Sequence, residues 1–233
     1  MYIALSVEYG CDDQLIFAQQ LGVEHVLVSI EDWDETTLNR VKNRVEKSAL
    51  QLAGLEGLAL GDVDAASAAL RAAGAVGIGM VVAAPAAIDD RGPRGRGAAL
   101  VGSVGVAAVA AAAIAPVVAM ANEAGVQLAL AADIEGAGVD LDLATMGSAA
   151  IADYGERLAL VRAGNAAAGR EAFLNEGETD VPGALMALKK AGFNGPIRAV
   201  APPGMVGDTE WGHKGRAYDL GYLKAVLQTI ESL

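Results

Sequence analysis

The sequence predicts a parallel (β/α)8 barrel, the TIM-barrel class of α/β fold, as a single domain over residues 1–233. The first observation is that eight short apolar runs alternate with helical patterns, which is typical of βα units in a parallel sheet. The second is the length of 233 residues, which suits one compact barrel and is short for two domains. The third is the end of the chain, where an apolar run, a polar loop and an amphipathic helix form a closing βα unit.

The eight expected strands are short runs of apolar and β-branched residues. They cover 2–7, 24–29, 50–57, 76–83, 126–131, 139–144, 157–163 and 196–201. Helical patterns fill most of the intervals, and they cover 12–21, 34–49, 62–73, 98–124, 151–154 and 181–191. In the last helix, Leu220, Leu223, Leu227 and Ile230 recur at helical spacing and mark its buried face.

Residues that favour helix ends set several of the expected boundaries. Asp12 is suited to cap the first helix, because its carboxylate can accept hydrogen bonds from N–H groups of the first turn, and Gly22 follows as a stop. Gly74 is expected to end the helix at 62–73. Pro116 lies inside the apolar pattern at 98–124, where it would kink or break a helix.

One interval between expected strands is too short for a helix. Only residues 133–138 join the fifth strand to the sixth. A parallel crossover normally needs a dozen or more residues. Either one outer helix is absent at this point, which we rank first, or a single element has been divided into two.

Charge and composition exclude several kinds of partner. The formal net charge of −12 argues against nucleic acids and anionic membranes, because both attract clustered Lys and Arg. The uncharged segment between Arg96 and Glu123 is mostly alanine and contains Pro116, so a buried helix is favoured over a membrane span. Aromatic residues make up only 4% of the chain, and alanine gains little free energy on burial, so we expect a homo-oligomer.

The N-terminal region and the cysteine content predict a cytoplasmic protein. Cys11 is the only cysteine, so no disulfide can form within the chain. The first residues contain no basic segment and no cleavage site of a signal peptide.

Two polar loops are candidate sites. Residues 91–97 place three arginines among glycines ahead of a helix, and such a loop can bind an anion, although a solvated basic loop is the alternative. The loop ahead of the last helix carries Asp208 and His213, and His213 is the better placed of the two histidines for acid–base chemistry. Clustered metal-ligand spacings are not found, so no metal ligand is assigned.

Five stretches of the chain resemble the mannonate dehydratases, a branch of the xylose-isomerase-like TIM barrels. They read FAQQLGVEHVLVS, RGRGAALVGS, NEAGVQLALAAD, FLNEGETDVPGALMALKKAGFNGPIR and GDTEWGHKGRAYDLGYLKAVLQ. The last two are the most specific, and the likeness extends over nearly the whole length. The resemblance implies a TIM barrel that dehydrates D-mannonate to 2-keto-3-deoxy-D-gluconate with a divalent metal such as Mn²⁺.

The resemblance also implies roles for individual residues. It implies catalytic roles for His213, Asp180 and Tyr222, and contacts to a small sugar acid for Arg94, Arg96, Arg198 and Asp208.

The positions that correspond to the metal ligands of this family carry other residues. The family has histidine, cysteine, histidine and aspartate at successive strand ends. This chain has Ala131, Ala144, Ala159 or Arg162, and Val200 at those positions. Alanine and valine offer no lone pair, and arginine would bring a positive charge toward the cation.

No metal cofactor is therefore expected, and the predicted function is a mannonate dehydratase-like protein that does not turn over. The alternatives are a non-catalytic barrel that binds a sugar acid, and a sugar isomerase or epimerase of the same superfamily.

Overall fold

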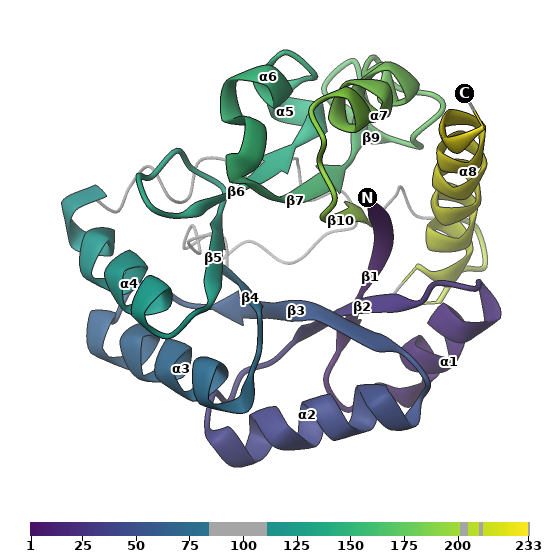
Figure 1. Cartoon of the computed structure of the whole chain (residues 1–233). Helices are drawn as coiled ribbons and strands as arrows, with labels where there is room; N and C mark the ends of the chain where they lie inside the picture. Colours follow the sequence, from purple (N-terminus) through teal and green to yellow (C-terminus); the bar gives the residue numbers. More distant parts are fainter. Residues whose placement is uncertain (84–110, 201–204, 210–211, 233) are drawn as a thin grey trace. The chain divides into compact units, whose positions relative to one another are not determined.

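The computed structural model describes residues 1–83, 111–200, 205–209 and 212–232. Eight strands form one closed barrel in the order β1-β10-β7-β6-β5-β4-β3-β2, which follows the chain (Figure 1). The predicted (β/α)8 class is confirmed. By residue contacts the described chain divides into two compact units, an N-terminal unit of residues 4–83 and 111–140 and a C-terminal unit of residues 1–3 and 141–232.

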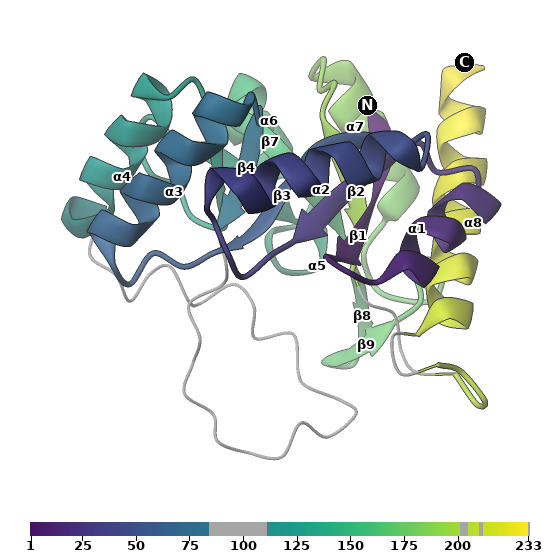
Figure 2. The same ribbon diagram turned by 90° about the horizontal axis from the view of Figure 1, so that it is seen from below.

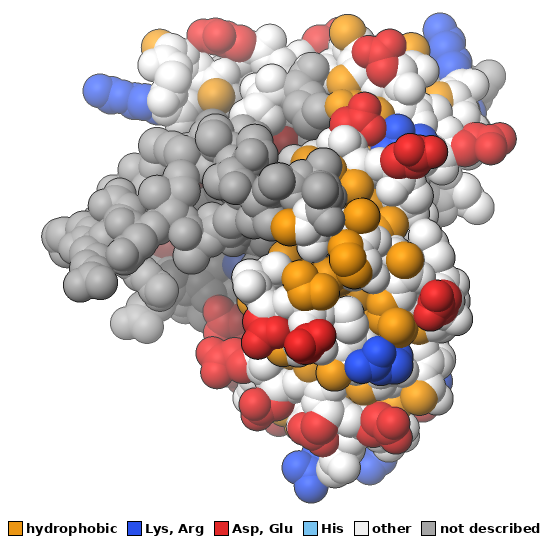
Figure 3. All heavy atoms as spheres, turned by 90° about the vertical axis from the view of Figure 1, so that its left-hand side faces the viewer, with side chains coloured by type: hydrophobic (Ala, Val, Ile, Leu, Met, Phe, Trp, Pro, Cys, Tyr) orange, Lys and Arg blue, Asp and Glu red, His pale blue; other side chains and the backbone are white. Residues whose placement is uncertain are grey.

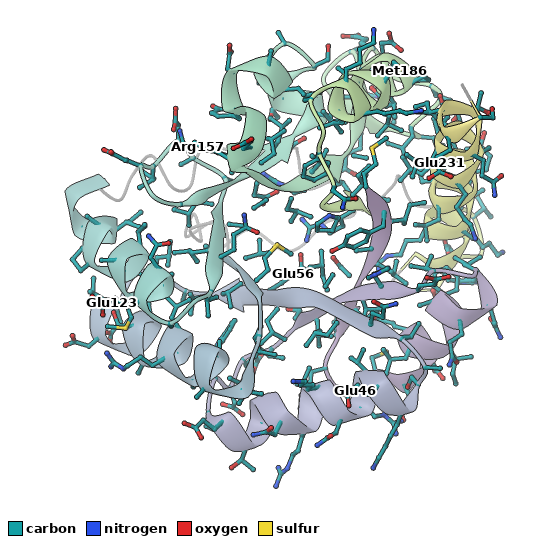
Figure 4. The ribbon with its side chains drawn as sticks, in the orientation of Figure 1. Glu46, Glu56, Glu123, Arg157, Met186 and Glu231 are labelled. Atoms are coloured by element: carbon teal, nitrogen blue, oxygen red, sulfur yellow. The ribbon has the colours of Figure 1, made fainter. Side chains whose placement is uncertain are left out.

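The N-terminal unit consists of βα repeats with parallel neighbours. Its strands are β1 (Tyr2–Glu8), β2 (His25–Ser29), β3 (Gln51–Leu58), β4 (Met80–Ala83) and β5 (Gln127–Leu130), and it contains the start of β6 (Gly138–Asp142). Its helices are α1 (Asp12–Gln20), α2 (Glu35–Lys47), α3 (Val63–Val76) and α4 (Ala111–Glu123). Figure 1 shows α2 and α3 covering one face of β3 and β4. The side chain of Glu56 projects from the opposite face of β3 and is buried (Figure 4).

The link between β5 and β6 contains no helix, as the sequence predicts. Residues 131–137 are all described, and they form bends and turns. The register explains how so short a link suffices, because β5 and β6 overlap through only two pairs, Ala129 with Gly138 and Leu130 with Val139. The chain therefore does not have to return along the whole of β5. Three further residues of β6 extend past the end of β5, about 10 Å at 3.3 Å per residue.

Two predicted helix boundaries in this unit are wrong. Asp12 is the first helical residue of α1, while Cys11 occupies the capping position without a side-chain hydrogen bond. The carboxylate of Asp12 instead forms an ion pair with Arg44 of α2. Helix α3 continues past Gly74 to Val76 and ends at Gly77, whose φ of +78° is favoured by glycine.

Gly74 has a packing role in the contact between α3 and α4. A methyl group placed on Gly74 would lie 2.4 Å from the carbonyl oxygen of Ala124. The third helix therefore contains glycine because α4 approaches it closely. Strand β4 consequently begins only at Met80, later than the predicted residue 76.

Helix α4 continues through Pro116, so of the two predicted outcomes, a kink or a break, the break is wrong. Residues 98–110 of the predicted helix at 98–124 lie outside the described residues. The whole arginine loop at 91–97 lies outside them as well. Among the described helices, none is long and apolar enough to cross a membrane. Apolar side chains gather on the face of α3 and α4 (Figure 3). Ala115, Pro116 and Ala119 of α4 are exposed.

The C-terminal unit contains two strands that the sequence did not predict. Its elements are the end of β6, α5 (Leu143–Met146), α6 (Ala150–Tyr154), the 3₁₀ turn η2 (Gly155–Arg157), β7 (Leu158–Ala163), β8 (Asn165–Ala167), β9 (Arg170–Ala172), α7 (Val181–Lys190), β10 (Pro196–Ala199) and α8 (His213–Glu231). Strands β8 and β9 form a small antiparallel hairpin directly after β7. Figure 2 shows this hairpin at the end of the unit where α8 begins.

Three predicted boundaries in this unit shift. The sixth strand ends at Asp142, so that Ala144 lies in α5 rather than in a strand. The last strand ends at Ala199. Helix α8 begins at His213, which the sequence analysis assigned to the loop ahead of this helix.

Candidate functional site

The carboxyl ends of β6, β7 and β10 converge on a wall of small side chains. A methyl group placed on Gly164, which follows β7, would lie 3.3 Å from Cγ2 of Val200 and 3.6 Å from Cβ of Ala144. Ala144 follows β6 and Val200 follows β10. In a TIM barrel this end of the strands carries the active site.

This convergence allows a test of whether a divalent metal fits. By the resemblance, Ala144 and Val200 would stand at two positions of metal ligands, and they lie together at the strand ends. Methyl and isopropyl groups offer no lone pair, and tetrahedral or octahedral sites need several N, O or S ligands. Among the described residues, no three His, Cys, Asp or Glu side chains are grouped so as to hold a metal. The side chains of this wall therefore offer no ligand for a divalent metal.

A buried ion pair lies beside the wall of small side chains. Nη1 of Arg162 in β7 is 3.5 Å from Oδ2 of Asp142 at the end of β6. The exposed fractions of the two side chains are 11% and 4%. Asp142 is held in place because its Oδ1 accepts a hydrogen bond of 3.0 Å from the N–H of Ala144, which caps α5. Charges this deeply buried interact far more strongly than charges in water.

Arg198 lies next to Arg162 in the sheet. The register of β10 and β7 pairs Arg198 with Arg162, and paired residues of parallel strands project from the same face. The side chains of Arg162 and Arg198 therefore project from the same face of two neighbouring strands, close to the carboxyl ends of these strands. The sequence analysis singled out Arg198 and missed the ion pair of Arg162. The available signal was an arginine inside an otherwise apolar strand.

Asp180 and Tyr222, both predicted to be catalytic, lie near each other. Asp180 caps α7, and its Oδ1 accepts a hydrogen bond of 3.0 Å from the N–H of Gly183. Burial raises the pKa of Tyr222, and the negative charge of Asp180 raises it further. The Tyr222 phenol is therefore held in its protonated form, in which it can donate a hydrogen bond.

Asp208 and His213 are in direct contact. The distance between Oδ1 of Asp208 and Nδ1 of His213 is 2.8 Å, and the exposed fractions of the side chains are 5% and 35%. Asp208 also accepts hydrogen bonds from three backbone N–H groups, those of Thr209, Lys214 and Gly215, at 2.8, 2.9 and 3.2 Å.

These contacts determine the charge state of Asp208 and what it can bind. Burial by itself would raise the pKa of the Asp208 carboxyl, but the backbone hydrogen bonds and the positive charge of His213 outweigh it and lower this pKa. Three of these contacts are made by Oδ1 of Asp208 and one by Oδ2. Asp208 thus caps the start of α8 and orients His213, while its contact to substrate stays a prediction.

A second buried polar network holds the segment that follows β7. The side-chain amide of Asn165 donates to the carbonyl oxygens of Leu174 and Thr179, at 2.9 and 3.1 Å. Its oxygen accepts from the N–H of Thr179 at 2.8 Å. Asp219 of α8, only 1% exposed, accepts from the N–H of Leu174 at 3.0 Å. Sequence analysis did not find this network, because its partners are up to 45 residues apart.

Tyr218 of α8 also contacts this segment. Its ring packs edge-on against Phe173 with centroids 4.9 Å apart, and its hydroxyl accepts a hydrogen bond of 2.9 Å from Asn175. The segment that follows the hairpin is thus fixed to α8 by the buried carboxylate of Asp219, and by the aromatic contact and the hydrogen bond of Tyr218. Arg94 and Arg96, the remaining predicted substrate contacts, lie outside the described residues.

Comparison with known proteins places this fold. No known family model matches the sequence, and no curated protein matches it. Several solved structures are similar over almost the whole chain. Mannonate dehydratase from Streptococcus suis serotype 2 superimposes with a TM-score of 0.81 and 15% identity, covering 99% of this chain and 95% of that one. A xylose isomerase domain protein from Planctomyces limnophilus gives 0.75 and 14%, covering 100% of both chains.

Sugar epimerases are similar as well. D-Psicose 3-epimerase from Clostridium cellulolyticum H10, solved with D-tagatose, gives a TM-score of 0.65 and 15% identity, covering 97% of this chain and 99% of that one. At such identities the likeness establishes the fold alone, a (β/α)8 TIM barrel, which this chain shares with these proteins.

Proposed function

We propose that this chain is a mannonate dehydratase-like barrel that binds a small sugar acid and does not carry out metal-dependent dehydration. The observation that carries this proposal is the wall formed by Ala144, Gly164 and Val200 beside the partly buried arginines of β7 and β10. Such a site offers positive charge and apolar surface in place of metal ligands. Pockets for small ligands commonly combine apolar walls with a few polar groups.

The chemistry of dehydration explains why turnover is not expected. Removing water from a sugar acid takes a weakly acidic proton next to a carboxylate, and negative charge develops there in the transition state. A divalent cation normally stabilises such charge as a Lewis acid. Ala144 and Val200 supply no metal ligand. We therefore expect the chain to bind the sugar acid but not to dehydrate it at an ordinary enzyme rate.

The proposal has a direct test in two measurements. The first follows keto-acid formation from D-mannonate with Mn²⁺, Mg²⁺, Co²⁺ or Zn²⁺, and we expect rates far below the roughly 1 s⁻¹ of a slow ordinary enzyme. The second measures thermal unfolding with D-mannonate and D-gluconate. A ligand at 100 times its Kd adds about 2.7 kcal/mol to the free energy of unfolding, so a clear rise in Tm is expected.

Neutral ketoses provide the comparison. D-Psicose and D-tagatose at the same concentrations should produce a smaller rise in Tm than the aldonates. Ordinary turnover of mannonate would contradict the proposal. A Tm that responds to ketoses and not to aldonates would favour an epimerase-like function instead.

Restoring the family's ligands tests the assignment of positions. The variant with Ala131→His, Ala144→Cys, Arg162→His and Val200→Asp should bind Mn²⁺ or Zn²⁺ with a measurable stoichiometry. Three ligands plus an open position make a catalytic site. The matched control omits Val200→Asp, and it should bind the metal at least tenfold more weakly. Equal metal affinity of the two variants would show that Val200 does not occupy a ligand position.

A further inference from the structure

We infer that Asn194 is a site of spontaneous covalent modification, at which the backbone nitrogen of Gly195 attacks the side-chain amide. A bond forms between this nitrogen and Cγ of Asn194, the bond from Cγ to Nδ2 breaks, and the amide nitrogen leaves as ammonia with the proton of the Gly195 N–H. Water then opens the resulting succinimide ring and leaves either aspartate or isoaspartate in place of asparagine. This inference is independent of the proposed function.

The sequence distinguishes Asn194 from every other asparagine of the chain. Asn194 is followed by glycine, whereas the other five asparagines are followed by arginine, glutamate or alanine. Glycine has no Cβ that would obstruct the approach of its own nitrogen, and it adopts a wide range of backbone angles. Because the two reacting groups belong to adjacent residues, ring closure is intramolecular and needs no encounter between molecules.

The local structure leaves both reacting groups accessible. Asn194 is exposed, and Gly195 lies in a bend just before β10, which begins at Pro196. Within the part of the chain that the structure describes, no residue accepts a hydrogen bond from the N–H of Gly195. The attacking nitrogen therefore does not have to leave a helix or a sheet before it can react.

Met1 provides a hydrogen-bond donor that favours the attack. Its nitrogen donates a hydrogen bond of 2.9 Å to Oδ1 of Asn194, and the two residues belong to the same compact unit. Negative charge develops on this oxygen when the nitrogen of Gly195 adds to Cγ. A donor already held at hydrogen-bond distance stabilises that charge, on the same principle as the oxyanion hole of a hydrolase.

The packing around Gly195 requires a glycine at this position. A methyl group placed on Gly195 would lie 2.6 Å from Cζ of Phe193 and 3.1 Å from the carbonyl oxygen of Ala159. Phe193 is buried, so its ring has little room to move away. The fold thus retains the residue that makes Asn194 reactive.

The position of Asn194 gives the two products different effects on the barrel. The N–H of Tyr2 donates to the carbonyl oxygen of Gly195 at 3.2 Å, where β1 lies beside the start of β10. Aspartate keeps the main chain unchanged and places a carboxylate against the nitrogen of Met1. Isoaspartate adds a methylene carbon to the main chain directly before Gly195, so we expect this product to displace the carbonyl oxygen from Tyr2 and to weaken the closure between β1 and β10.

The test is a time course of the purified full chain at 37 °C, at pH 6 and at pH 8.5. Tryptic peptides are analysed by mass spectrometry for the increase in mass that results when NH₂ is exchanged for OH. Asn175 is the internal control, because it is also exposed in a turn but is followed by glutamate. The matched variant is Asn194→Gln, whose longer side chain cannot form the same five-membered ring.

We expect Asn194 to be modified at least about tenfold faster than Asn175, because only glycine leaves the attacking nitrogen unobstructed. The rate should rise from pH 6 to pH 8.5, since the nitrogen attacks after it loses its proton, and Asn194→Gln should stay unmodified at this position. The same time course is followed in urea. Modification that occurs only in the unfolded chain, or equal rates at Asn194 and Asn175 in the folded protein, would overturn the inference.

A second measurement tests the effect on the barrel. The modified protein is separated by ion exchange through its added negative charge, and isoaspartate is distinguished from aspartate by enzymatic methylation. We expect the fraction with isoaspartate to have a lower Tm than the parent, and Asn194→Asp, which reproduces the other product, to unfold close to the parent. An isoaspartate fraction with the Tm of Asn194→Asp would refute the predicted weakening between β1 and β10.

Discussion

Replacing Asp219 with asparagine measures what a buried carboxylate costs this fold. Burial raises the pKa of Asp219 to about 6; the hydrogen bond from Leu174 lowers it in part, and the charge of Glu176 raises it. In the unfolded chain the same group titrates near 3.8. The folded state therefore binds this proton more tightly than the unfolded state, so the stability contributed by protonation is fully present below pH 3.8 and is lost as pH rises through 6.

The expected size of the effect follows from these two values. With pKa values of 3.8 and about 6, lowering the pH from 8 to 5 stabilises the fold by about 1.4 kcal/mol through this group alone. The full effect, reached only at lower pH, would be about 3 kcal/mol. The range from pH 5 to 8 is preferred because the isoelectric point of about 4.5 favours precipitation at lower pH.

The assay is urea unfolding of the parent and of Asp219→Asn at pH 5 and pH 8. Asparagine keeps an oxygen that can accept the N–H of Leu174 but cannot ionise, so its fixed packing cost cancels between the two pH values. The stability of the variant relative to the parent should be greater at pH 8 than at pH 5 by about 1.4 kcal/mol.

Glu231→Gln on the same helix is the control, because Glu231 is exposed and should give no such difference (Figure 4). A variant whose stability relative to the parent is the same at both pH values would refute the reasoning.

Two further predictions concern helix packing and capping in the N-terminal unit. Gly74→Ala should lower the free energy of unfolding by about 1–3 kcal/mol, because its methyl group would overlap the carbonyl of Ala124. A methyl group on Gly79 would have nothing within 4 Å, so Gly79→Ala should be nearly neutral. Urea unfolding of both variants tests this prediction, and equal stabilities of the two variants would contradict it. Asp62→Ala removes hydrogen bonds of 3.0 Å to the first turn of α3 and should cost about 1 kcal/mol with little change in activity or ligand binding, which thermal unfolding would show.

The sequence predicted the barrel because alternation of apolar runs and helical patterns is a local property. Each strand of the barrel was found within a few residues of its true bounds. The errors arose where a residue's role depends on a distant contact. A glycine such as Gly74 normally indicates the end of a helix. Here the close approach of Ala124 explains why a glycine lies inside α3.

The candidate site was harder to predict for the same reason. Arg198 was identified through the resemblance, while the ion pair between Arg162 and Asp142 depends on the pairing of strands that are far apart in sequence. The hairpin after β7 has strands of only three residues each, too short for periodicity to reveal. Its support by Asn165 and Asp219 could be recognised only once α8 had been placed beside it.

The small overlap between β5 and β6 makes their link a place where the chain can tolerate insertion. The entropy cost of closing a loop grows with the logarithm of its length, so doubling the seven residues between Leu130 and Gly138 would cost only about 0.6 kcal/mol. The far end of the link is anchored by the hydrogen bond from Asn122 to the carbonyl oxygen of Gly136, so new residues belong before this turn. An added peptide, or a helix gained in evolution, could enter there while every strand pair keeps its partner.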